Sequence, residues 1–273
     1  MAASHSPFPK ITVITPSFNQ GQYIEQTIRS VLDQGYPFLE YLVLDGGSTD
    51  QTPEILRRYQ GRLTFISESD RGQTHAINKG LAMATGDILC YLNSDDQLAP
   101  KALEKVGSFF LNHPECAWLT GRARIIDGDG REILKLITCY KNTWLLIHSP
   151  SVFAVLNYVS QPSTFWRRSL TDRIGIFDES LHYAMDYDYW LRLMQVEKLW
   201  VLQDYLALYR VHAESKGSTG AALHFSEELQ VARRNIPVRG LLGLHAMHNR
   251  LILWVYKQIG AKSAPTKEAL QDS

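Results

Sequence analysis

The sequence has few cysteines, no excess of charge of either sign and no long apolar run. Its three cysteines are an odd number without the spacing of a zinc site, so they predict neither a disulfide framework nor a structural metal. Lys and Arg number 28, as do Asp and Glu, which argues against the basic excess of proteins that coat nucleic acid. No apolar stretch approaches the roughly 20 residues of a membrane span. Residues 1–10 are short and polar, unlike a signal peptide, so we expect a soluble cytoplasmic protein with no nucleic-acid partner.

Two common nucleotide-binding signatures are also missing. The first predicted strand is followed by Ser17-Phe18-Asn19-Gln20-Gly21 where a dinucleotide-binding fold has GxGxxG, and the chain has no GxxxxGK[ST] phosphate loop. Nicotinamide and P-loop chemistry are therefore disfavoured. What remains is ordinary globular composition, with 45% hydrophobic and 21% charged residues in a chain of 273, which is long enough to bury a core without staples.

Strand and helix signals alternate over the first hundred residues. We predict strands over 10–16, 39–44, 63–67 and 87–92, and helices over 22–34, 52–59 and 74–84. This alternation predicts an α/β fold whose mostly parallel sheet is flanked by helices. Farther along we expect a hairpin over 117–136, an irregular aromatic stretch over 138–165, a helix over 187–194, a long strand over 199–211 and helices from 221 onward.

Polar and acidic residues follow the four early strands, at the end of a parallel sheet where ligands bind. Asp45 follows the second strand, where a carboxylate can accept hydrogen bonds from a base or a ribose. Asp95 and Asp96 follow the fourth strand, and paired carboxylates suit Mg²⁺ or Mn²⁺ bound to a substrate phosphate. The alternative is that these residues only form turns or cap the next helix, since Asn, Asp and Gly favour both.

Short motifs occur in a fixed order along residues 10–215. They are Ile-Thr-Pro-Ser-Phe-Asn at 14–19, Val-Leu-Asp-Gly-Gly-Ser-Thr-Asp at 43–50, Gly-Gln-Thr-His-Ala-Ile-Asn-Lys-Gly at 72–80, Ala-Thr-Gly-Asp-Ile-Leu at 84–89, Leu-Asn-Ser-Asp-Asp at 92–96, Gln-Pro-Ser-Thr-Phe-Trp at 161–166, Met-Asp-Tyr-Asp-Tyr-Trp-Leu-Arg at 185–192 and Tyr-Arg-Val-His at 209–212. This ordered set resembles the family 2 glycosyltransferases, which have the GT-A fold.

The resemblance implies an architecture and a reaction. Residues 1–220 would form a GT-A-like, Rossmann-like catalytic domain with its nucleotide-sugar half at 10–100 and its acceptor half at 101–220, followed by a helical extension over 221–273. The reaction would move a sugar, with inversion, from a nucleotide diphosphate donor to a hydroxyl of a glycan or lipid-linked acceptor. A UDP-sugar is the first guess for the donor. The rival functions are a nucleotidyltransferase and a catalytically silent domain that binds sugar nucleotides or glycans.

The resemblance also implies roles for single residues. Donor binding would fall to Thr15, Pro16, Phe18, Asn19, Asp45, Asp70, Asn78, Lys79, Ser94 and Asp95. A divalent metal, Mn²⁺ or Mg²⁺, would be held by Asp95, Asp96 and His212, and the acceptor side would carry Gln161 and Trp166. The sequence departs from the family pattern at Asn93, where an acidic residue is usual, and at Gly46, where a second acid often follows.

Asp186 matches the family's catalytic acidic residue, which takes the proton of the acceptor hydroxyl as that oxygen attacks the sugar. Asp188 is its rival. Two positions apart on a helix mean about 200° of rotation, so the two carboxylates cannot face the same site. The alternative for both is a purely structural one, because acidic side chains are favoured at a helix N-terminus.

The C-terminal segment differs in charge from the rest of the chain. From Leu229 through Lys267 it carries seven basic residues and no acidic one, with apolar residues near helical spacing. One interpretation is a helix packed on the catalytic domain or on a second subunit of a homo-oligomer. The other is a surface helix that holds the enzyme at the anionic inner face of a membrane, where lipid-linked acceptors would be. Pro237 and Gly240 predict an interruption of the helix.

Overall fold

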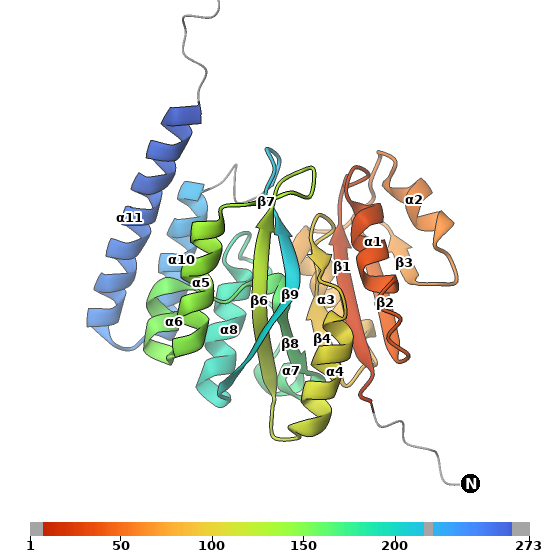
Figure 1. Cartoon of the computed structure of the whole chain (residues 1–273), viewed down its shortest axis with the longest axis horizontal. Helices are drawn as coiled ribbons and strands as arrows, with labels where there is room; N and C mark the ends of the chain where they lie inside the picture. The colour runs from red at the N-terminus through yellow and green to blue at the C-terminus, as the bar shows by residue number, and fades with distance from the viewer. Residues whose placement is uncertain (1–7, 216–220, 264–273) are drawn as a thin grey trace, which may run out of the picture.

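The computed structural model describes residues 8–215 and 221–263, and in the second range it describes side chains over 223–252 (Figure 1). The centre of the molecule is a nine-stranded sheet of order β3-β2-β1-β4-β8-β6-β9-β5, with β7 paired to β6. The strands are β1 (Ile11–Ser17), β2 (Leu39–Asp45), β3 (Thr64–Ser67), β4 (Ile88–Tyr91), β5 (Gln97–Leu98), β6 (Trp118–Ile126), β7 (Glu132–Ile133), β8 (Thr164–Arg167) and β9 (Leu199–Arg210).

Helices connect most of these strands. They are α1 (Ile24–Leu32), α2 (Thr52–Arg58), α3 (Gln73–Met83), α4 (Ala102–Asn112), α5 (Lys135–Ile147), α6 (Pro150–Leu156), α7 (Arg168–Ile174), α8 (Met185–Val196), α10 (Ala221–Asn235) and α11 (Arg239–Ser263), with a 3₁₀ turn, η1, over Gln161–Ser163. The strands and helices predicted for the first hundred residues are confirmed. The irregular stretch predicted over 138–165 is wrong, because most of it forms α5 and α6. Its aromatic spacing is helical: Tyr140 and Trp144 lie one turn apart with ring centroids 6.1 Å from each other.

The sheet is parallel in its first half and mixed beyond β4. β1 pairs in parallel with β2 and β4, and β2 with β3. β8 then runs antiparallel to both β4 and β6, while β9 runs parallel to β6. The mostly parallel sheet is therefore confirmed over residues 11–91. Because β8 is reversed, η1 at its start lies at the carboxyl end of β4 and beside the middle of β6, where the Ser163 hydroxyl donates to the Gly121 carbonyl at 2.9 Å. β6 runs toward the top of Figure 1.

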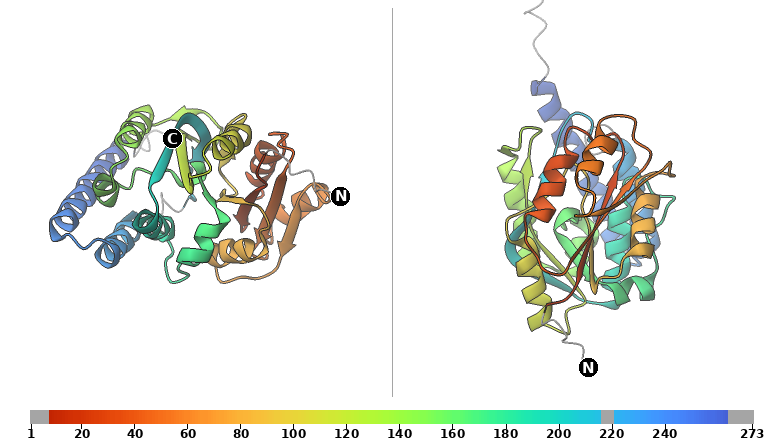
Figure 2. Two further views of the ribbon diagram at one scale, coloured as in Figure 1. Left: turned by 90° about the horizontal axis from the view of Figure 1, so that it is seen from below. Right: turned by 90° about the vertical axis from the view of Figure 1, so that its right-hand side faces the viewer.

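The core lies on both faces of the sheet. Alternation along β1 shows why, since Val13 packs into the cluster under α1 and α4 whereas Ile14 packs into the cluster under α3 and α8. The second cluster is rich in aromatic rings and includes Trp118, Trp166 and Trp190, all fully buried. Helices cover both faces in the end-on view (Figure 2), which is the layered α/β arrangement that the sequence predicts.

The C-terminal helices pack on the rest of the molecule. α10 lies against α8, and α11 lies against α6 and α10 (Figures 1 and 2). Val231 and Ala232 of α10 are fully buried in the same cluster as Trp190. α10 ends at Asn235 and α11 begins at Arg239, so the predicted interruption near Pro237 is confirmed. The division at residue 220 stays a prediction. Within the described ranges, no helix is long and apolar enough to cross a membrane.

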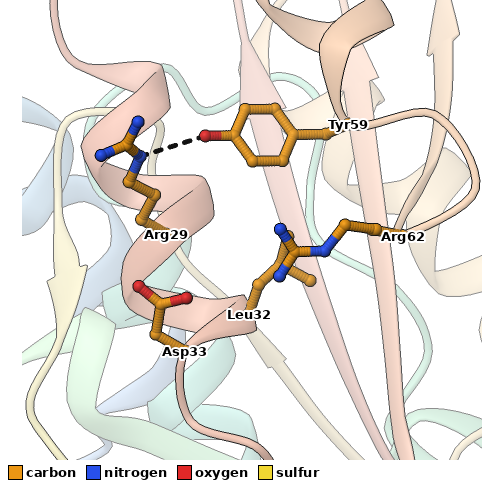
Figure 3. Close-up of a pocket in the computed structure, with 5 residues that line it drawn as sticks. All are labelled: Arg29, Leu32, Asp33, Tyr59 and Arg62. Atoms are coloured by element: carbon orange, nitrogen blue, oxygen red, sulfur yellow. Dashed lines mark hydrogen bonds between the residues drawn. The ribbon is translucent and has the colours of Figure 1, made fainter.

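A pocket of about 280 Å³ lies between the last turn of α1 and the chain that follows α2 (Figure 3). It is lined by Arg29, Leu32, Asp33, Tyr59 and Arg62, and the Arg29 Nε–H donates to the Tyr59 hydroxyl at 3.1 Å. Because α1 runs back, opposite to β1, its last turn lies far from the carboxyl edge of the sheet. The pocket therefore stands apart from the predicted site residues.

Candidate active site

Asp45 organises the loop between β2 and α2. Its side chain is buried at the end of β2, and its carboxylate accepts hydrogen bonds from the backbone N–H and the hydroxyl of Ser48 and from the Ser67 hydroxyl at 2.5 Å. These bonds draw the ends of β2 and β3 together. The predicted base or ribose contact would use the acceptor capacity that Asp45 has left.

The turn after β1 presents an aromatic ring to solvent. Asn19 adopts a left-handed φ of 51°, which Asn tolerates better than most residues, and its side-chain oxygen accepts the Thr49 N–H at 2.9 Å. Phe18, directly before it, is 60% exposed. The buried Ser17 hydroxyl has no hydrogen-bond partner among the described residues, an uncompensated polar atom at the end of β1. A bound nucleoside could supply that partner.

The structure places Thr15 and Pro16 differently from Phe18. The Thr15 hydroxyl is buried 3.2 Å from the Tyr41 hydroxyl, inside the sheet, and Pro16 lies in register with Leu44. The side chains of Thr15 and Pro16 are therefore buried in the sheet and support the end of β1. Only backbone groups of this pair remain for a nucleoside to meet.

Asp70 fills the space beside Gly46. A Cβ on Gly46 would stand 2.9 Å from Oδ2 of Asp70, and the other oxygen of Asp70 accepts the Gly72 N–H at 2.7 Å. The loop between β3 and α3 thus brings a carboxylate to the position next to Asp45. This close approach requires the glycine, and it supplies the acidic group that the sequence motif lacks.

Asn78 and Lys79 hold neighbouring segments. The Asn78 side chain donates to the Phe177 carbonyl at 2.9 Å and accepts the Phe177 N–H at 3.0 Å, so it ties α3 to the chain before α8. Lys79 forms an ion pair with Glu68. The structure therefore gives Asn78 a buried structural role, whereas Lys79 would have to exchange Glu68 for a diphosphate to bind one.

Asp95 and His212 meet across the carboxyl edge. Oδ2 of Asp95, after β4, lies 3.1 Å from Nε2 of His212, after β9. The Tyr23 ring packs on His212 with centroids 4.6 Å apart and leaves the imidazole 7% exposed. A carboxylate oxygen with an imidazole nitrogen is a donor set that suits Mn²⁺. No group of three potential protein ligands occurs among the described residues, so other ligands would come from the substrate phosphates or water.

Asp96 occupies a different place from Asp95. Its fully buried carboxylate accepts the Arg210 backbone N–H at 2.8 Å and the Asn93 amide at 3.2 Å. Burial, together with the charge of Asp95, raises the pKa of Asp96 well above its ordinary value. The carboxylate anchors the end of β9. The predicted metal site required it to lie with Asp95 and His212, but its hydrogen bonds go to Arg210 and Asn93 instead.

Arg210 fixes the loops around Asp95 from below. It is 1% exposed, and its guanidinium donates to the carbonyls of Asp95, Asp127 and Gly128 and to the Gln26 side chain at 2.8–2.9 Å. These bonds use four of its five N–H donors. Arg210 therefore neutralises carbonyl dipoles of the protein, and a diphosphate would find no exposed guanidinium here.

Asn93 joins three elements at the same edge. It accepts from Gln73 of α3 at 2.7 Å and donates to Asp96 and to Gln161 of η1. Gln161 also donates to the Tyr91 carbonyl at 2.6 Å, so the predicted acceptor-side residue does lie beside the end of β4. Ser94 is held through its carbonyl, which accepts the buried Thr27 hydroxyl at 2.9 Å.

Trp166, the other predicted acceptor-side residue, is part of the core. Its ring is fully buried and its indole N–H donates to the Thr171 hydroxyl at 2.9 Å. The reversed direction of β8 places Trp166 opposite Leu89, away from the carboxyl end of β4. A sugar therefore has no surface of this ring to contact.

Asp186 lies in the first turn of α8, partly exposed, with one oxygen accepting the Tyr187 N–H at 2.7 Å. Burial raises its pKa; Glu228 adds to the rise, whereas His224 and Lys141 oppose it. The buried Tyr91 phenol links this carboxylate to β4. Burial raises the Tyr91 pKa first, and the negative charges of Asp186 and Asp96 raise it further. The start of α8 lies at the same edge of the sheet as Asp95, because the Thr74 hydroxyl of α3 lies 2.7 Å from the Met185 sulfur and the neighbouring Gln73 donates to Asn93 at 2.7 Å.

Asp188 faces a different environment. Its buried carboxylate forms an ion pair with Arg192 at 2.8 Å and accepts the Asn235 amide at 3.2 Å. Arg192 in turn donates to the carbonyls of Ile174 and Ile176. Asp188 therefore links α8 to α10 and to the end of α7, and the two acids differ in surroundings as their helical spacing predicts.

Sequence reasoning missed the charged groups that approach Asp186 from elsewhere. Lys141 comes from α5, and His224 and Glu228 come from α10. Glu227 of α10 binds the backbone just before α8. Glu227 contacts the segment that enters α8, whereas Glu228 binds the amides of Asn157 and Asn249, and no local motif marks either acid. The available signal was their position, since they are the last acidic residues before the basic C-terminal segment.

Comparison with known proteins identifies relatives of this chain. The family model for glycosyl transferase family 2 matches residues 12–199, more than half of the chain. An uncharacterized glycosyltransferase of Rickettsia prowazekii (strain Madrid E) is 28% identical over 227 residues, which cover 81% of this chain and 70% of that protein. The putative teichuronic acid biosynthesis glycosyltransferase TuaG of Bacillus subtilis (strain 168) is 36% identical over 134 residues, 47% of this chain and 52% of that protein.

Solved structures share the fold at lower sequence identity. The mannosyltransferase PcManGT from Pyrobaculum calidifontis, in complex with GDP-Man and Mn²⁺, superposes with a TM-score of 0.69 at 21% identity, covering 98% of this chain and 80% of that one. S. aureus TarS 1-349 in complex with UDP-GlcNAc gives a TM-score of 0.66 at 20% identity, covering 88% and 69%. The ordered motifs, the sheet with its polar carboxyl edge and the matching family model agree, and the chain belongs to glycosyl transferase family 2.

Proposed function

We propose that this glycosyltransferase moves a sugar, with inversion, from a nucleotide diphosphate donor to a hydroxyl of a glycan or lipid-linked acceptor. The observation that supports the proposal is the Asp95–His212 pair after β4 and β9, with the start of α8, which carries Asp186, packed on α3 at the same edge through the contact of the Thr74 hydroxyl with the Met185 sulfur at 2.7 Å. A UDP-sugar is the first donor to test, and a GDP-sugar the second. TarS and PcManGT, which share the fold, were solved with UDP-GlcNAc and GDP-Man.

Donor binding uses the loops after β1, β2 and β3. Phe18 offers an exposed ring, the Ser17 hydroxyl an unsatisfied polar atom, and Asp45 and Asp70 two carboxylates whose other bonds hold them still. An aromatic face together with carboxylate acceptors suits a base and the hydroxyls of a ribose. These groups would bind the nucleoside, with the diphosphate directed toward Asp95.

Asp95 and His212 would hold the divalent metal, Mn²⁺ in preference to Mg²⁺ because one donor is an imidazole nitrogen. When bound, such an ion offsets the negative charge that develops on the departing diphosphate. Arg210 and Asp96 contribute by fixing the two loops from which the pair projects. Lys79 would add a cation if the diphosphate displaces Glu68.

Asp186 takes the proton in the transfer step. The acceptor hydroxyl gives its proton to the carboxylate while its oxygen forms a bond to C1 of the sugar, from the face opposite the diphosphate. The bond between C1 and the phosphate oxygen breaks, and its electron pair leaves with the nucleoside diphosphate. Burial raises the Asp186 pKa, which makes it a stronger base than an ordinary aspartate.

Asp186→Asn tests the assignment, with Asp188→Asn as its control on the same helix. The amide keeps the shape and loses the basicity, so we expect kcat to fall by about 10²–10⁴ with donor binding kept. Because burial disfavours the ionised carboxylate, Asp186→Asn should melt no lower than the native protein at neutral pH. Asp188→Asn weakens the pair with Arg192 and should lower the melting temperature while sparing kcat.

Turnover with each donor is followed through the released product. Free nucleoside diphosphate identifies sugar transfer, whereas pyrophosphate would identify nucleotidyl transfer. If Asp188→Asn abolishes kcat and Asp186→Asn does not, the base is misassigned. Donor binding without any product in the native protein would show a sugar-nucleotide-binding domain instead.

We propose, finally, that α11 places the enzyme on the anionic inner face of a membrane. Leu244, Met247 and Leu251 form an apolar stripe at helical spacing and are 48%, 63% and 56% exposed. Arg239 and Arg250 on the same helix are also exposed, and the sequence from 229 to 267 has no acidic residue. The C-terminal end of α11 extends past the carboxyl edge of the sheet in Figure 1, so the helix passes beside the level of the candidate site.

A further inference from the structure

The start of α8 is held by a side chain from a different helix. Ala184 is the residue that precedes the helix, and its side chain offers no hydrogen-bond acceptor to cap it. Instead, the backbone N–H groups of His182, Tyr183 and Ala184 donate to the carboxylate of Glu227 on α10, at 3.1, 2.7 and 3.0 Å. One carboxylate thus binds three successive N–H groups where the chain enters α8, and the Ala184 N–H among them belongs to the N-cap residue. We call this contact from α10 the cap of α8.

This carboxylate is kept charged. Burial opposes ionisation of Glu227, but the bonds from Tyr183, Ala184 and His182 outweigh it, so the Glu227 pKa lies below its ordinary value. A negative charge at the N-terminus of a helix also complements the helix dipole. At neutral pH the cap is therefore an anion bound by backbone amides.

The cap acts on the residue that carries the chemistry. Ala184 is held from both sides, because its N–H donates to Glu227 and its carbonyl accepts the Asp188 N–H, the first bond of the helical ladder, at 3.0 Å. Asp186 lies between those two residues. The orientation of its carboxylate follows the direction in which α8 begins.

Glu227 itself sits on a firm base. One turn further along α10, Val231 and Ala232 are fully buried in the aromatic core. On the exposed side, Arg234 pairs with Asp178 at 3.2 Å, which ties α10 to the same segment that leads into α8. The position of the Glu227 carboxylate is thereby determined by packing rather than by the loop it binds.

We propose that Glu227 is a positioning residue for sugar transfer: from α10 it caps α8 and holds Asp186 in the orientation that accepts the acceptor proton. The inference rests on the proposed role of Asp186 as the base. It makes α10 part of the catalytic unit. Glu227 takes no part in the proton transfer itself, because its carboxylate is hydrogen-bonded to backbone N–H groups.

Glu227→Gln, Glu227→Asp and Glu197→Gln test the proposal in the full-length protein. An amide has one acceptor oxygen and no charge, so we expect kcat to fall about 10- to 100-fold, as small misplacements of a catalytic group do, with the donor KM unchanged. Glu227→Asp keeps the charge on a shorter stem and should recover part of the loss. Glu197→Gln, the same change at the far end of α8 where Glu197 pairs with Arg173 at 2.6 Å, should leave kcat unaltered.

Amide hydrogen exchange gives a readout that needs no turnover. In Glu227→Gln the amides of Tyr183 and Ala184 should exchange faster than in the native protein, and in Glu197→Gln they should not. Unchanged exchange would overturn the cap, and faster exchange with a native kcat would overturn its role in catalysis. A general loss of protection across α8 and α10 would show that Glu227→Gln unfolds this region. The proposal is then tested with Glu227→Asp, by its amide exchange at residues 183 and 184 and by its kcat.

The assignment of Asp186 as the base is tested separately from the role of Glu227. If Asp186→Asn retains native turnover, the proposed base is wrong. Because Asp186→Asn leaves Glu227 in place, its exchange at residues 183 and 184 should stay native, whatever its turnover. A Glu227→Gln defect in kcat alongside an active Asp186→Asn would mean that the cap positions a different group, which overturns the inference as stated.

Discussion

Asp95 and Asp96 are neighbours in sequence, yet their carboxylates meet opposite surroundings. Asp95 keeps 19% of its side chain exposed and reaches His212, whereas Asp96 is fully buried against the Arg210 N–H. A buried carboxylate that is hydrogen-bonded to the backbone mainly supports the fold, whereas a partly exposed carboxylate beside an imidazole can bind a cation. The same distinction separates Asp186 from Asp188 on α8.

Substitutions at the two acids should therefore differ in kind. Asp95→Ala and His212→Ala should each weaken Mn²⁺-dependent donor binding by about tenfold or more in calorimetry, because each removes one ligand. Asp96→Ala should instead lower stability by about 1–3 kcal/mol, since it leaves the Arg210 backbone N–H without its acceptor and takes one of two acceptors from the Asn93 amide. EDTA should stop turnover of the native protein.

The control is Asp129→Ala, an exposed acid near the same edge whose carboxylate pairs with Arg131 at 2.9 Å. It should affect neither measurement. Full activity in EDTA would overturn the metal requirement and transfer charge neutralisation to a cation such as Lys79. An Asp96→Ala protein with native stability but no metal binding would restore Asp96 as a ligand.

At the scale of elements, α5, α8 and α10 surround one carboxylate. His224 of α10 and Lys141 of α5 act to lower the pKa of Asp186, and Glu228 of α10 acts to raise it. Burial lowers the Lys141 pKa, while the charges of Asp186 and Glu228 act to raise it. Glu228 is held by the amides of Asn157 at 2.6 Å and Asn249 at 3.3 Å, so α6 and α11 also reach this cluster. Packing among helices thus tunes the base.

The pH dependence of kcat/KM should report this cluster. Asp186 works as a base only when ionised, so activity should fall as the pH drops through its raised pKa. Glu228→Gln removes a negative charge that raises that pKa, so the acid limb should move to lower pH. Glu197→Gln, remote from the cluster, should leave the limb in place.

A limb that stays in place or moves to higher pH in Glu228→Gln would contradict the assignment of that limb to Asp186. The thermal stability of the variant should be recorded over the same range. A profile that follows unfolding rather than ionisation would then be recognised from the melting temperature.

In the whole molecule, the two C-terminal helices differ in how much of their apolar surface is buried. α10 buries Val231 and Ala232 in the aromatic core, so for it the packed alternative is confirmed. α11 packs on α6 and α10 with one face and leaves its apolar stripe uncovered within the described side chains. Removal of all residues after Ser226 would therefore damage the core, and substitution of the stripe is the cleaner experiment.

The membrane proposal predicts salt-sensitive sedimentation with liposomes of rising anionic lipid content. Each cation near such a surface contributes on the order of 1 kcal/mol. Serine in place of Leu244, Met247 and Leu251 together should abolish binding, and Leu111→Ser, at an exposed apolar position on α4, should not. If the native protein stays in the supernatant at low salt, the membrane role fails. A loss of self-association in the triple variant by analytical ultracentrifugation would assign the stripe to a homo-oligomer.

Much of this protein follows from local pattern in the sequence. Period-2 and period-3.6 alternation predicts the first four strands and three helices, and their order brings Asp45, Asp95 and the turn after β1 to one edge. Helical spacing alone separates Asp186 from Asp188. These features depend on residues a few positions apart, whose geometry backbone dihedrals and side-chain periodicity determine.

Contacts between distant segments were decided only by the tertiary structure. Sheet order and helix packing join separate parts of the chain, and four features depend on them. These are the contact of Asp95 with His212, the approach of Asp70 to Gly46, the burial of Trp166 and the contact of Glu227 with the start of α8. A carboxylate has the same local pattern whether it faces a metal, a backbone N–H or solvent. Its role is set by the partners and the burial that the complete fold gives it.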